Sequence, residues 1–446
     1  MGVMNLVRMT VGTMCLVMAA GGHCQTATMS LEAAYNLARE GEPFLEVARY
    51  RVQSAEAERD AIRGRILPQV TAFGQWSDNE ITYDGAFSDV YGRQEYPGER
   101  YGFEIRQSLI NMSNWREVER YGALSDLSKS ELAQQELKTL LSVADAYLRY
   151  LIADARKAQL TSEFEALKQQ LEEATALQGF SLMPITEVLE IRTRTESVKA
   201  DVIEATAAVS IAQETLAMLT DAPSIVPMPL RRDFQLPLRV LSPIDASELA
   251  NQFSPEIAAA RDGVEAARFA VEREKGSWWP DIDLVFSQQY SDVGFDNATA
   301  PARTTETIQL AVNYPIFEGG AGSARRRAAR ADFYGAQQRL EGIRREVESS
   351  ARSAWIRFEA ATERLEAARS AVEASDVHVD AAQKSVKAGT ARVTDVLLAL
   401  AQRTQVTQKA SAAAGQYVLD WLELELLTGT SPDALAPQLT NFLFEQ

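Results

Sequence analysis

The sequence predicts an α+β membrane protein built from a duplicated unit of two strands followed by two long helices. Three observations predict it: an internal repeat, strand segments with one apolar and one polar face, and helical intervals too long for an ordinary globular core. The repeated segments are 66–70 and 278–282, 107–111 and 314–318, and 185–189 and 393–397. All three recur after about 210 residues. A regular internal repeat has to be recognised first, because overlooking it leads to the wrong fold. We therefore expect one pseudo-symmetric body with residues 28–235 and 236–446 as its structural repeats.

Residues 1–27 have the pattern of a secretory signal peptide. Arg8 supplies the positive segment, and Val11–Ala20 is an apolar core too short to cross a bilayer as a helix. Cleavage is expected after one of three residues, Gly22, Cys24 or Ala27. Lipidation of Cys24 is an open alternative, but His23 stands where a small residue is wanted, which favours the non-lipidated form.

Composition limits the class of protein. With 45 basic against 62 acidic residues the net charge is −17, which disfavours nucleic acid as a partner. This acidity indicates either ordinary solubility or an acidic lumen. The two cysteines, Cys15 and Cys24, give no disulfide framework. No later stretch has about 18 consecutive apolar residues, so we expect no transmembrane helix. An exported chain without one is periplasmic, secreted, or a barrel in the outer membrane.

Catalytic signatures are missing from the sequence. The two histidines are His23 and His378, which leaves metal sites and histidine-dependent catalysis poorly supported. No nucleophile elbow, phosphate loop or dinucleotide fingerprint stands out. The sequence therefore predicts no enzyme, no cofactor and no metal site.

Strand segments with two different faces occur in each repeat. They are expected at 66–76, 101–110, 280–290 and 306–316, with polar loops at 77–100 and 291–305. A membrane strand needs about 9–11 residues that alternate between apolar and polar side chains. In the fourth segment Ile308, Leu310 and Val312 alternate with polar or small residues, whereas Phe73 breaks the pattern in the first. The alternative is a soluble antiparallel sheet with one wet face.

Aromatic side chains near the strand ends are the candidates for an interfacial girdle. They are Trp76, Tyr101, Trp278, Trp279, Tyr290 and Tyr314. Four strands cannot close a barrel, because the smallest membrane barrels have about eight and an open edge in lipid is costly. The strands must therefore be pooled with those of other copies, in a number that periodicity does not reveal.

Long proline-free intervals rich in helix-forming residues predict the helices. They are expected at 114–177, 185–220, 324–387 and 393–428, with further helices at 30–63 and 246–275. Apolar residues three and four apart indicate antiparallel coiled-coil packing, and the alternative is an ordinary helical bundle. Each long pair turns over at a glycine-containing loop, 178–184 or 388–392, and a glycine cap accounts for Gly179 and Gly389.

An ordered set of motifs now resembles a known family. The set comprises the opening Met29–Ala38, Leu67-Pro68 before the first strand, Tyr314–Gly320 after the last strand, and Gly389–Leu397 at the second turn. Together they resemble the TolC family of outer-membrane efflux and secretion channels, over essentially the whole mature chain.

The resemblance implies a homotrimer in the outer membrane of a Gram-negative bacterium. Three copies of four strands would form a twelve-stranded β-barrel, continued by an α-helical coiled-coil tunnel across the periplasm. The implied function is the passive exit duct of a tripartite efflux or type I secretion system. The implied partners are outer-membrane lipid, a periplasmic adaptor and an inner-membrane pump of the ABC or RND type.

The resemblance also implies sites at the helical turns. Family members have an aperture ringed by acidic side chains, where Asp395 matches one position and Glu187 is its counterpart in the first repeat. A second acidic position is replaced by Leu398. The alternative is that both acids merely favour helix starts. The adaptor-contacting tips would include Gly179, Gly389, Thr390 and Arg392.

Two other classes of protein compete with the duct: a periplasmic coiled-coil adaptor and a secreted structural coiled coil. Neither needs two strand pairs with lipid-patterned faces, and solubility only in detergent separates the duct from both. The cargo is not indicated by the sequence.

Overall fold

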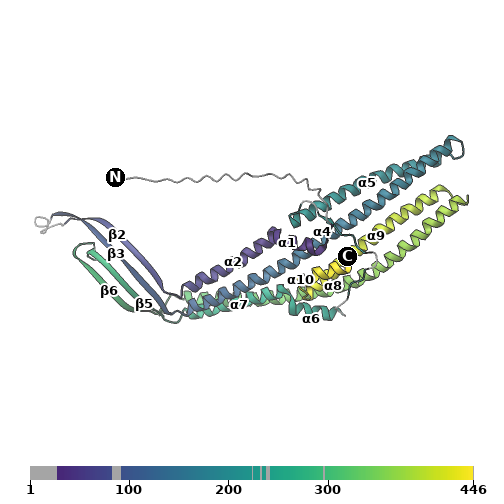
Figure 1. The fold of residues 1–446 in the computed structure, drawn as a ribbon. Helices are drawn as coiled ribbons and strands as arrows, with labels where there is room; N and C mark the ends of the chain where they lie inside the picture. Colours follow the sequence, from purple (N-terminus) through teal and green to yellow (C-terminus); the bar gives the residue numbers. More distant parts are fainter. Residues whose placement is uncertain are drawn as a thin grey trace, which may run out of the picture.

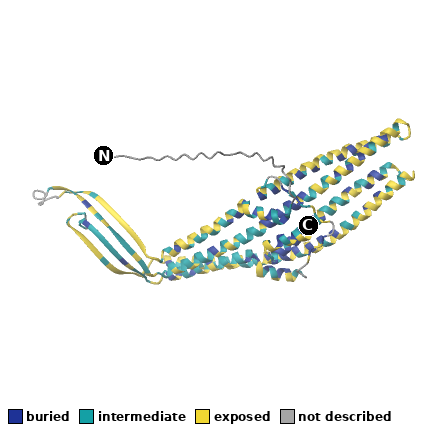
Figure 2. Cartoon of the chain, in the orientation of Figure 1, coloured by how far each residue is buried: buried dark blue, intermediate teal, exposed yellow. Residues whose placement is uncertain are grey.

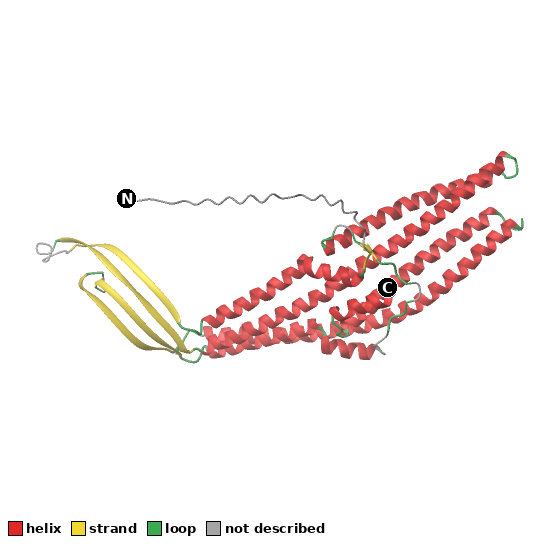
Figure 3. Ribbon diagram, viewed as in Figure 1, coloured by secondary structure: helices red, strands yellow, loops and turns green. Residues whose placement is uncertain are grey.

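The computed structural model is an elongated molecule with a β-sheet at one end and two helical hairpins at the other (Figure 1). The structure describes residues 28–82, 92–222, 225–231, 234–237, 242–294 and 297–444. The expected signal peptide, 1–27, lies outside the described residues. Between the two ends, helices run along the long axis without a globular interruption (Figure 3).

The sheet has four strands in the order β2-β3-β5-β6, and every pairing is antiparallel. The strands are β2 (Gln69–Thr82), β3 (Arg93–Ile110), β5 (Asp281–Val293) and β6 (Thr299–Asn313). The β3–β5 pair joins the two halves of the chain into one sheet. Among the described strands, β2 and β6 are the sheet edges.

The strands differ from the sequence expectation at their ends. Both hairpins continue past the alternating segments, so the described parts of the loops expected at 77–100 and 291–305 are largely strand. Pro97 and Gly98, which lie inside the expected loop, pair with Asp78 and Ser77 in the ladder. At the other end β6 stops at Asn313 instead of reaching 316, since Pro315 has no N–H to donate.

The helices next to the sheet form a layer, in which they follow the same order as the strands that they adjoin. They are α2 (Pro43–Gly64), α4 (Met112–Gly179), α7 (Pro255–Gly276) and α8 (Ala321–Lys387). α4 packs between α2 and α7, and α7 packs against α8. Since α2 leads into β2 and β6 leads into α8, the outer elements of the helical layer continue the two edges of the sheet (Figure 1).

Two helical hairpins extend away from the sheet. α4 turns into α5 (Ile185–Thr220), and α8 turns into α9 (Val393–Leu427). These bounds agree with the four predicted long helices to within a few residues. α5 is the one described helix that is long and apolar enough, by length and composition, to cross a membrane. It packs along α4 instead, and Ile191, Val198 and Ala205 are buried in that contact.

The two helices expected before the strand pairs are each divided into two. The helix expected at 30–63 is divided into α1 (Leu31–Gly41) and α2, which begins at Pro43. The helix expected at 246–275 is α6 (Pro243–Phe253) followed by α7, which begins at Pro255. Proline favours the first turn of a helix but forces the preceding residue to be extended, so each proline starts a new helix.

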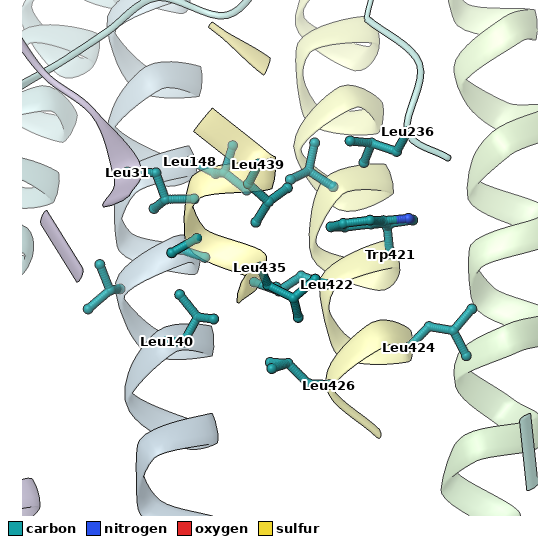
Figure 4. Packing of buried hydrophobic residues seen from close by; sticks show 14 of the residues in the cluster. Leu31, Leu140, Leu148, Leu236, Trp421, Leu422, Leu424, Leu426, Leu435 and Leu439 are labelled. Atoms are coloured by element: carbon teal, nitrogen blue, oxygen red, sulfur yellow. The ribbon is translucent and has the colours of Figure 1, made fainter. Parts of the chain in front are cut away.

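The largest hydrophobic core lies midway along the molecule (Figure 2). Here α1, α4, α9 and α10 (Pro432–Leu443) meet the segment that links the two halves of the chain. Trp421 is fully enclosed among the hydrophobic residues of this core (Figure 4). Its Nε1 donates a hydrogen bond to the Pro237 carbonyl, 2.8 Å away. The Tyr147 hydroxyl donates to the Met29 carbonyl at 2.7 Å and accepts from the Met228 amide at 2.8 Å. These bonds anchor the start of the chain and the linker, which pair as β1 (Thr28–Met29) and β4 (Val226–Pro227).

Candidate functional site

Strand register sorts the side chains of the sheet onto two chemically different faces. Residues that pair across an antiparallel ladder point to the same face. One such row, near the middle of the sheet, is Val70, Ile105, Phe286 and Ile308. The rows beside it add Leu284 with Leu310, Ile282 with Val312, and Ala72 with Phe103. This face is apolar over all four strands and has the character of a lipid-facing surface.

The opposite face is predominantly polar. Its central row is Thr71, Glu104, Ser287 and Thr307. The salt bridge between Arg106 and Glu104 lies on this face, at 3.0 Å. Phe73, which broke the sequence pattern, points to this polar face together with Thr71, because side chains alternate between the two faces along a strand and Ala72 lies on the apolar face. The two faces together are the arrangement expected of a barrel wall between lipid and water.

Polar side chains interrupt the apolar face. Gln107 pairs with Leu284 across β3 and β5. Gln288 and Glu306 pair across β5 and β6, and the Gln288 side-chain amide donates to the Glu306 carboxylate at 2.8 Å. They lie one row from the Tyr101–Tyr290 pair, close to the end of the apolar band.

The six predicted interface aromatics form two levels. Tyr101 and Tyr290 are paired across β3 and β5 and stack with ring centroids 4.8 Å apart, near Trp76. Trp278, Trp279 and Tyr314 flank the other end of the sheet and are exposed. From Trp279 to Tyr290 the chain spans about 36 Å of strand, or about 25 Å at a tilt near 45°, which is the height of an outer-membrane apolar band.

The two hairpin tips are closed by the same backbone motif with different residues. After α4, Ser181 donates to the Gln178 carbonyl and Leu182 to the Leu177 carbonyl, both at 2.9 Å. After α8, the equivalent bonds run from Gly389 to Val386 at 2.9 Å and from Thr390 to Ser385 at 3.0 Å. Both pairs are the bonds of a Schellman motif, which requires a left-handed residue after the helix.

The left-handed residue is as predicted in only one tip. Gly389 has φ 72° and is the cap that the sequence indicated. In the first tip Ser181 has φ 58°, whereas Gly179 is the last residue of α4. The interpretation of Gly179 as a cap was therefore wrong, because serine occupies the left-handed position two residues later.

The two candidate aperture acids lie in separate hairpins. Asp395 is exposed, and its carboxylate accepts a hydrogen bond from the Arg392 amide at 2.9 Å. It therefore caps the start of α9, which is the role that the macrodipole alternative assigns to it. Glu187 has the equivalent position in α5, but the residue three before it is Pro184, which has no amide hydrogen to donate. Its carboxylate is consequently free of that bond.

A buried polar junction was missed by sequence reasoning. Glu163 on α4 is buried, and its two carboxylate oxygens accept from Arg194 of α5 at 2.6 Å and from Thr404 of α9 at 2.5 Å. The sequence held a signal, since Glu163 interrupts an apolar helical stripe between Leu160 and Leu167.

A second polar network lies where the helices meet the sheet. Glu274 is nearly buried and is paired with Arg273 at 2.5 Å and with Arg325 at 3.4 Å. Arg273 also reaches Glu117 at 3.3 Å, and Arg325 reaches Glu318 at 2.7 Å. The network joins α4, α7 and α8 at the base of the sheet.

Comparison with known proteins fits this geometry. A family model described as outer membrane efflux protein matches residues 34–221 and 246–430. The chain belongs to the outer membrane efflux protein family. It is 25% identical to the outer membrane protein TolC of Escherichia coli over 432 residues, covering 93% of this chain and 85% of TolC. It is 24% identical to the alkaline protease secretion protein AprF of Pseudomonas aeruginosa over 422 residues, covering 91% and 85%.

A solved structure shows the same fold. The CmeC outer membrane channel of Campylobacter jejuni superposes with a TM-score of 0.77 at 13% identity, covering 93% of this chain and 90% of CmeC. The predicted helical tunnel with a barrel is therefore the fold of the family. Membership places the chain in the outer membrane, extending into the periplasm, as an exit duct for efflux or secretion. The family is one of outer-membrane channels, which decides against the two coiled-coil alternatives.

Proposed function

We propose that the chain is the subunit of a homotrimer whose three sheets close one twelve-stranded barrel. The observation that supports this most directly is the coincidence of edges, because α2 with β2 and β6 with α8 form two continuous open sides. Unpaired backbone groups at a sheet edge are prohibitively costly in lipid. β2 and β6 run in opposite directions, so β6 of one copy meets β2 of the next in the antiparallel sense found throughout the sheet.

The helical sides are suited to the same contact. α2 and α8 each present a stripe of exposed side chains at spacings of three, four or seven residues, most of them small. The stripes are Val47, Tyr50, Ser54, Ala57 and Ala61 on α2, and Ala324, Ala328, Ala331, Gly335 and Gly342 on α8. Small side chains at this spacing allow close antiparallel packing of two helices. A second copy would therefore extend the helical layer as it extends the sheet.

The assembly would act as the passive exit duct of a tripartite efflux or type I secretion system. An inner-membrane pump of the ABC or RND type would supply the energy, and a periplasmic adaptor would join pump to duct. α8 is 67 residues long, or about 100 Å of helix, so the tips lie far from the membrane end. Gly179, Gly389, Thr390 and Arg392 are exposed at these tips, where the adaptor would dock.

The aperture and the girdle belong to the same proposal. Three copies would bring Asp395 and Glu187 around one axis at the periplasmic end, and carboxylates at a constriction favour cations. The aromatic levels around Tyr290 and Trp279 would sit at the two membrane interfaces. Residues 28–235 and 236–446 would be the two structural repeats, after removal of 1–27 as the signal peptide.

Planar-bilayer conductance of the detergent-extracted protein tests the proposal. We expect particles of three chains that form a cation-preferring pore, with Asp395→Ala losing selectivity or widening the pore. Asp395→Asn also removes the charge but keeps the side-chain size and can still accept from the Arg392 amide, so an effect shared by both variants comes from the lost charge and not from the lost cap. A pore indifferent to both variants would remove the aperture assignment. If the protein is soluble without detergent and forms no pore, the proposed function as an exit duct is wrong.

A further inference from the structure

We propose that the turn after β6 and the start of α8 bind the phosphodiester headgroup of a glycerophospholipid in the periplasmic leaflet of the outer membrane. The inference rests on the proposed orientation, in which this end of the barrel faces the periplasm. It concerns a defined site on each subunit, made of an apolar part and a basic part.

The apolar part projects from the turn. Ile316 and Phe317 are 88% and 86% exposed, the highest values among large hydrophobic side chains in the part of the chain that the structure describes. With Trp278 and Pro315 they line a pocket of about 160 Å³. An exposed apolar patch of this kind marks a contact with lipid or with another protein surface.

The position of the patch favours lipid over a neighbouring subunit. Ile282 and Val312 are the last paired residues of the apolar face, and the chain positions two further along each strand are Pro280 and Tyr314. The patch therefore continues the lipid-facing surface toward the periplasm. The pocket lies between the turn after β6, an edge strand, and Trp278, which precedes the inner strand β5, so it extends from the sheet edge back under the protomer's own sheet.

The basic part lies on the first turns of α8. The Arg326 guanidinium lies over the Trp278 ring, 4.3 Å from its centre. Arg325 is neutralised by Glu318 and Glu274. Across the ranges that the structure describes, neither Arg326 nor Arg327 is in a salt bridge. In a chain with a net charge of −17, this is a local excess of positive charge beside an apolar patch.

Only an amphiphile satisfies both parts at once. A phosphodiester oxygen pair matches the planar donors of a guanidinium, and the stacked ring holds Arg326 toward the headgroup level. Ile316 and Phe317 would then lie among the acyl chains, with tryptophan at the interface between the two zones. A free phosphate ion would use the arginines and leave the apolar side chains in water.

Native mass spectrometry of the detergent-extracted trimer tests the site. Phosphatidylglycerol is the probe, diacylglycerol with the same acyl chains is the control lipid, and inorganic phosphate is the competitor. We expect phosphatidylglycerol to bind, diacylglycerol to bind far more weakly, and phosphate not to compete. Arg326→Gln with Arg327→Gln should weaken phosphatidylglycerol binding about tenfold or more, since each basic residue near an anionic headgroup contributes to affinity. Arg339→Gln with Arg345→Gln, farther along α8, should leave it unchanged.

Three results would overturn the proposal. Equal affinity of the two double variants for phosphatidylglycerol would show that Arg326 and Arg327 do not bind the lipid. Displacement of the lipid by phosphate would show a simple anion site. If Ile316→Ser with Phe317→Ser dissociates the trimer while lipid affinity survives, the patch is a contact between subunits. Conductance measured on the same samples distinguishes failure of the lipid site from failure of the proposed function. The arginine variants should conduct like the wild type. A wild-type protein that forms no pore would contradict the proposed exit duct.

Discussion

Glu163 and Thr404 lie on different hairpins, yet the Thr404 hydroxyl donates a hydrogen bond of 2.5 Å to the Glu163 carboxylate. Arg194, on the helix that follows α4, completes the contact at 2.6 Å. A buried carboxylate is tolerated only when it is paired and hydrogen-bonded, so the junction ties three helices to one arrangement.

Replacing this carboxylate should loosen the two hairpins. Glu163→Gln keeps the side-chain size but leaves the Arg194 guanidinium without its anionic partner. We expect the local opening free energy around Thr404 to fall by about 2 kcal/mol, because the partly buried Arg194 guanidinium loses its anionic partner. Hydrogen exchange of the α9 amides measures this. Glu165→Gln, which alters an exposed acid two residues away, is the control, and equal exchange in both variants would contradict the prediction.

The hairpin tips predict opposite effects for two glycine substitutions. Gly179→Ala changes a helical residue and should stabilise the end of α4, by up to about 1 kcal/mol. Gly389→Ala changes a residue with φ 72° and should destabilise the end of α8 by about 1 kcal/mol. Amide exchange in the last turn of each helix gives the sign. The same sign at both tips would contradict the assignment of the caps.

Ser181 offers an independent check of the first tip. It holds the left-handed position with φ 58°, so Ser181→Gly should stabilise the tip by roughly 1 kcal/mol. If the substitution instead increases exchange at the end of α4, the serine contributes something that backbone strain does not describe.

These tips also show how far sequence reasoning reached. Helix lengths were predictable, because proline-free runs of helix formers and glycine turns are local signals. The choice of Ser181 over Gly179 was not, since a left-handed serine depends on the bonds that Leu182 and Leu177 make across the tip.

The sheet shows the same division between local and non-local information. Alternation along Ile308, Leu310 and Val312 indicated which face meets lipid. The central β3–β5 pairing joins residues far apart in sequence, and the shared edges of sheet and helices follow from it. Glu163 was missed for a related reason, since its partner Thr404 is 241 residues away.

The core at mid-length predicts loss of stability at alkaline pH. Burial raises the pKa of the Tyr147 hydroxyl, and burial, with Asp433 nearby, raises the pKa of Tyr35 to about 12. An unfolded tyrosine ionises near pH 10, as an approximate reference value. Above that pH the unfolded chain loses protons that the folded chain keeps, so stability falls as pH rises from about 10 to about 12.

Tyr147→Phe should reveal this contribution. At neutral pH it should cost about 1–3 kcal/mol, because the Met228 amide and the Met29 carbonyl lose a buried partner. The further loss between pH 10 and 12 should be smaller than in the wild type, since one titrating group is gone. Thermal unfolding in detergent at pH 8 and pH 11 compares the two. Tyr334→Phe removes an exposed hydroxyl and should follow the wild type at both values, and an equal alkaline loss in all three proteins would contradict the prediction.

Adjacent residues of β6 should respond to the same substitution in opposite ways. Ile308 pairs with Phe286 on the apolar face and Thr307 pairs with Ser287 on the polar face. Ile308→Arg should destabilise the assembled protein by about 2–4 kcal/mol, because it places a charge in lipid near the middle of the band. Thr307→Arg should assemble normally and shift ion selectivity toward anions, because the new charge enters the lumen. The fraction of assembled trimer and the reversal potential in a salt gradient measure the two effects. Equal assembly of both variants would contradict the assignment of the faces, and normal assembly of Ile308→Arg with failure of Thr307→Arg would invert it.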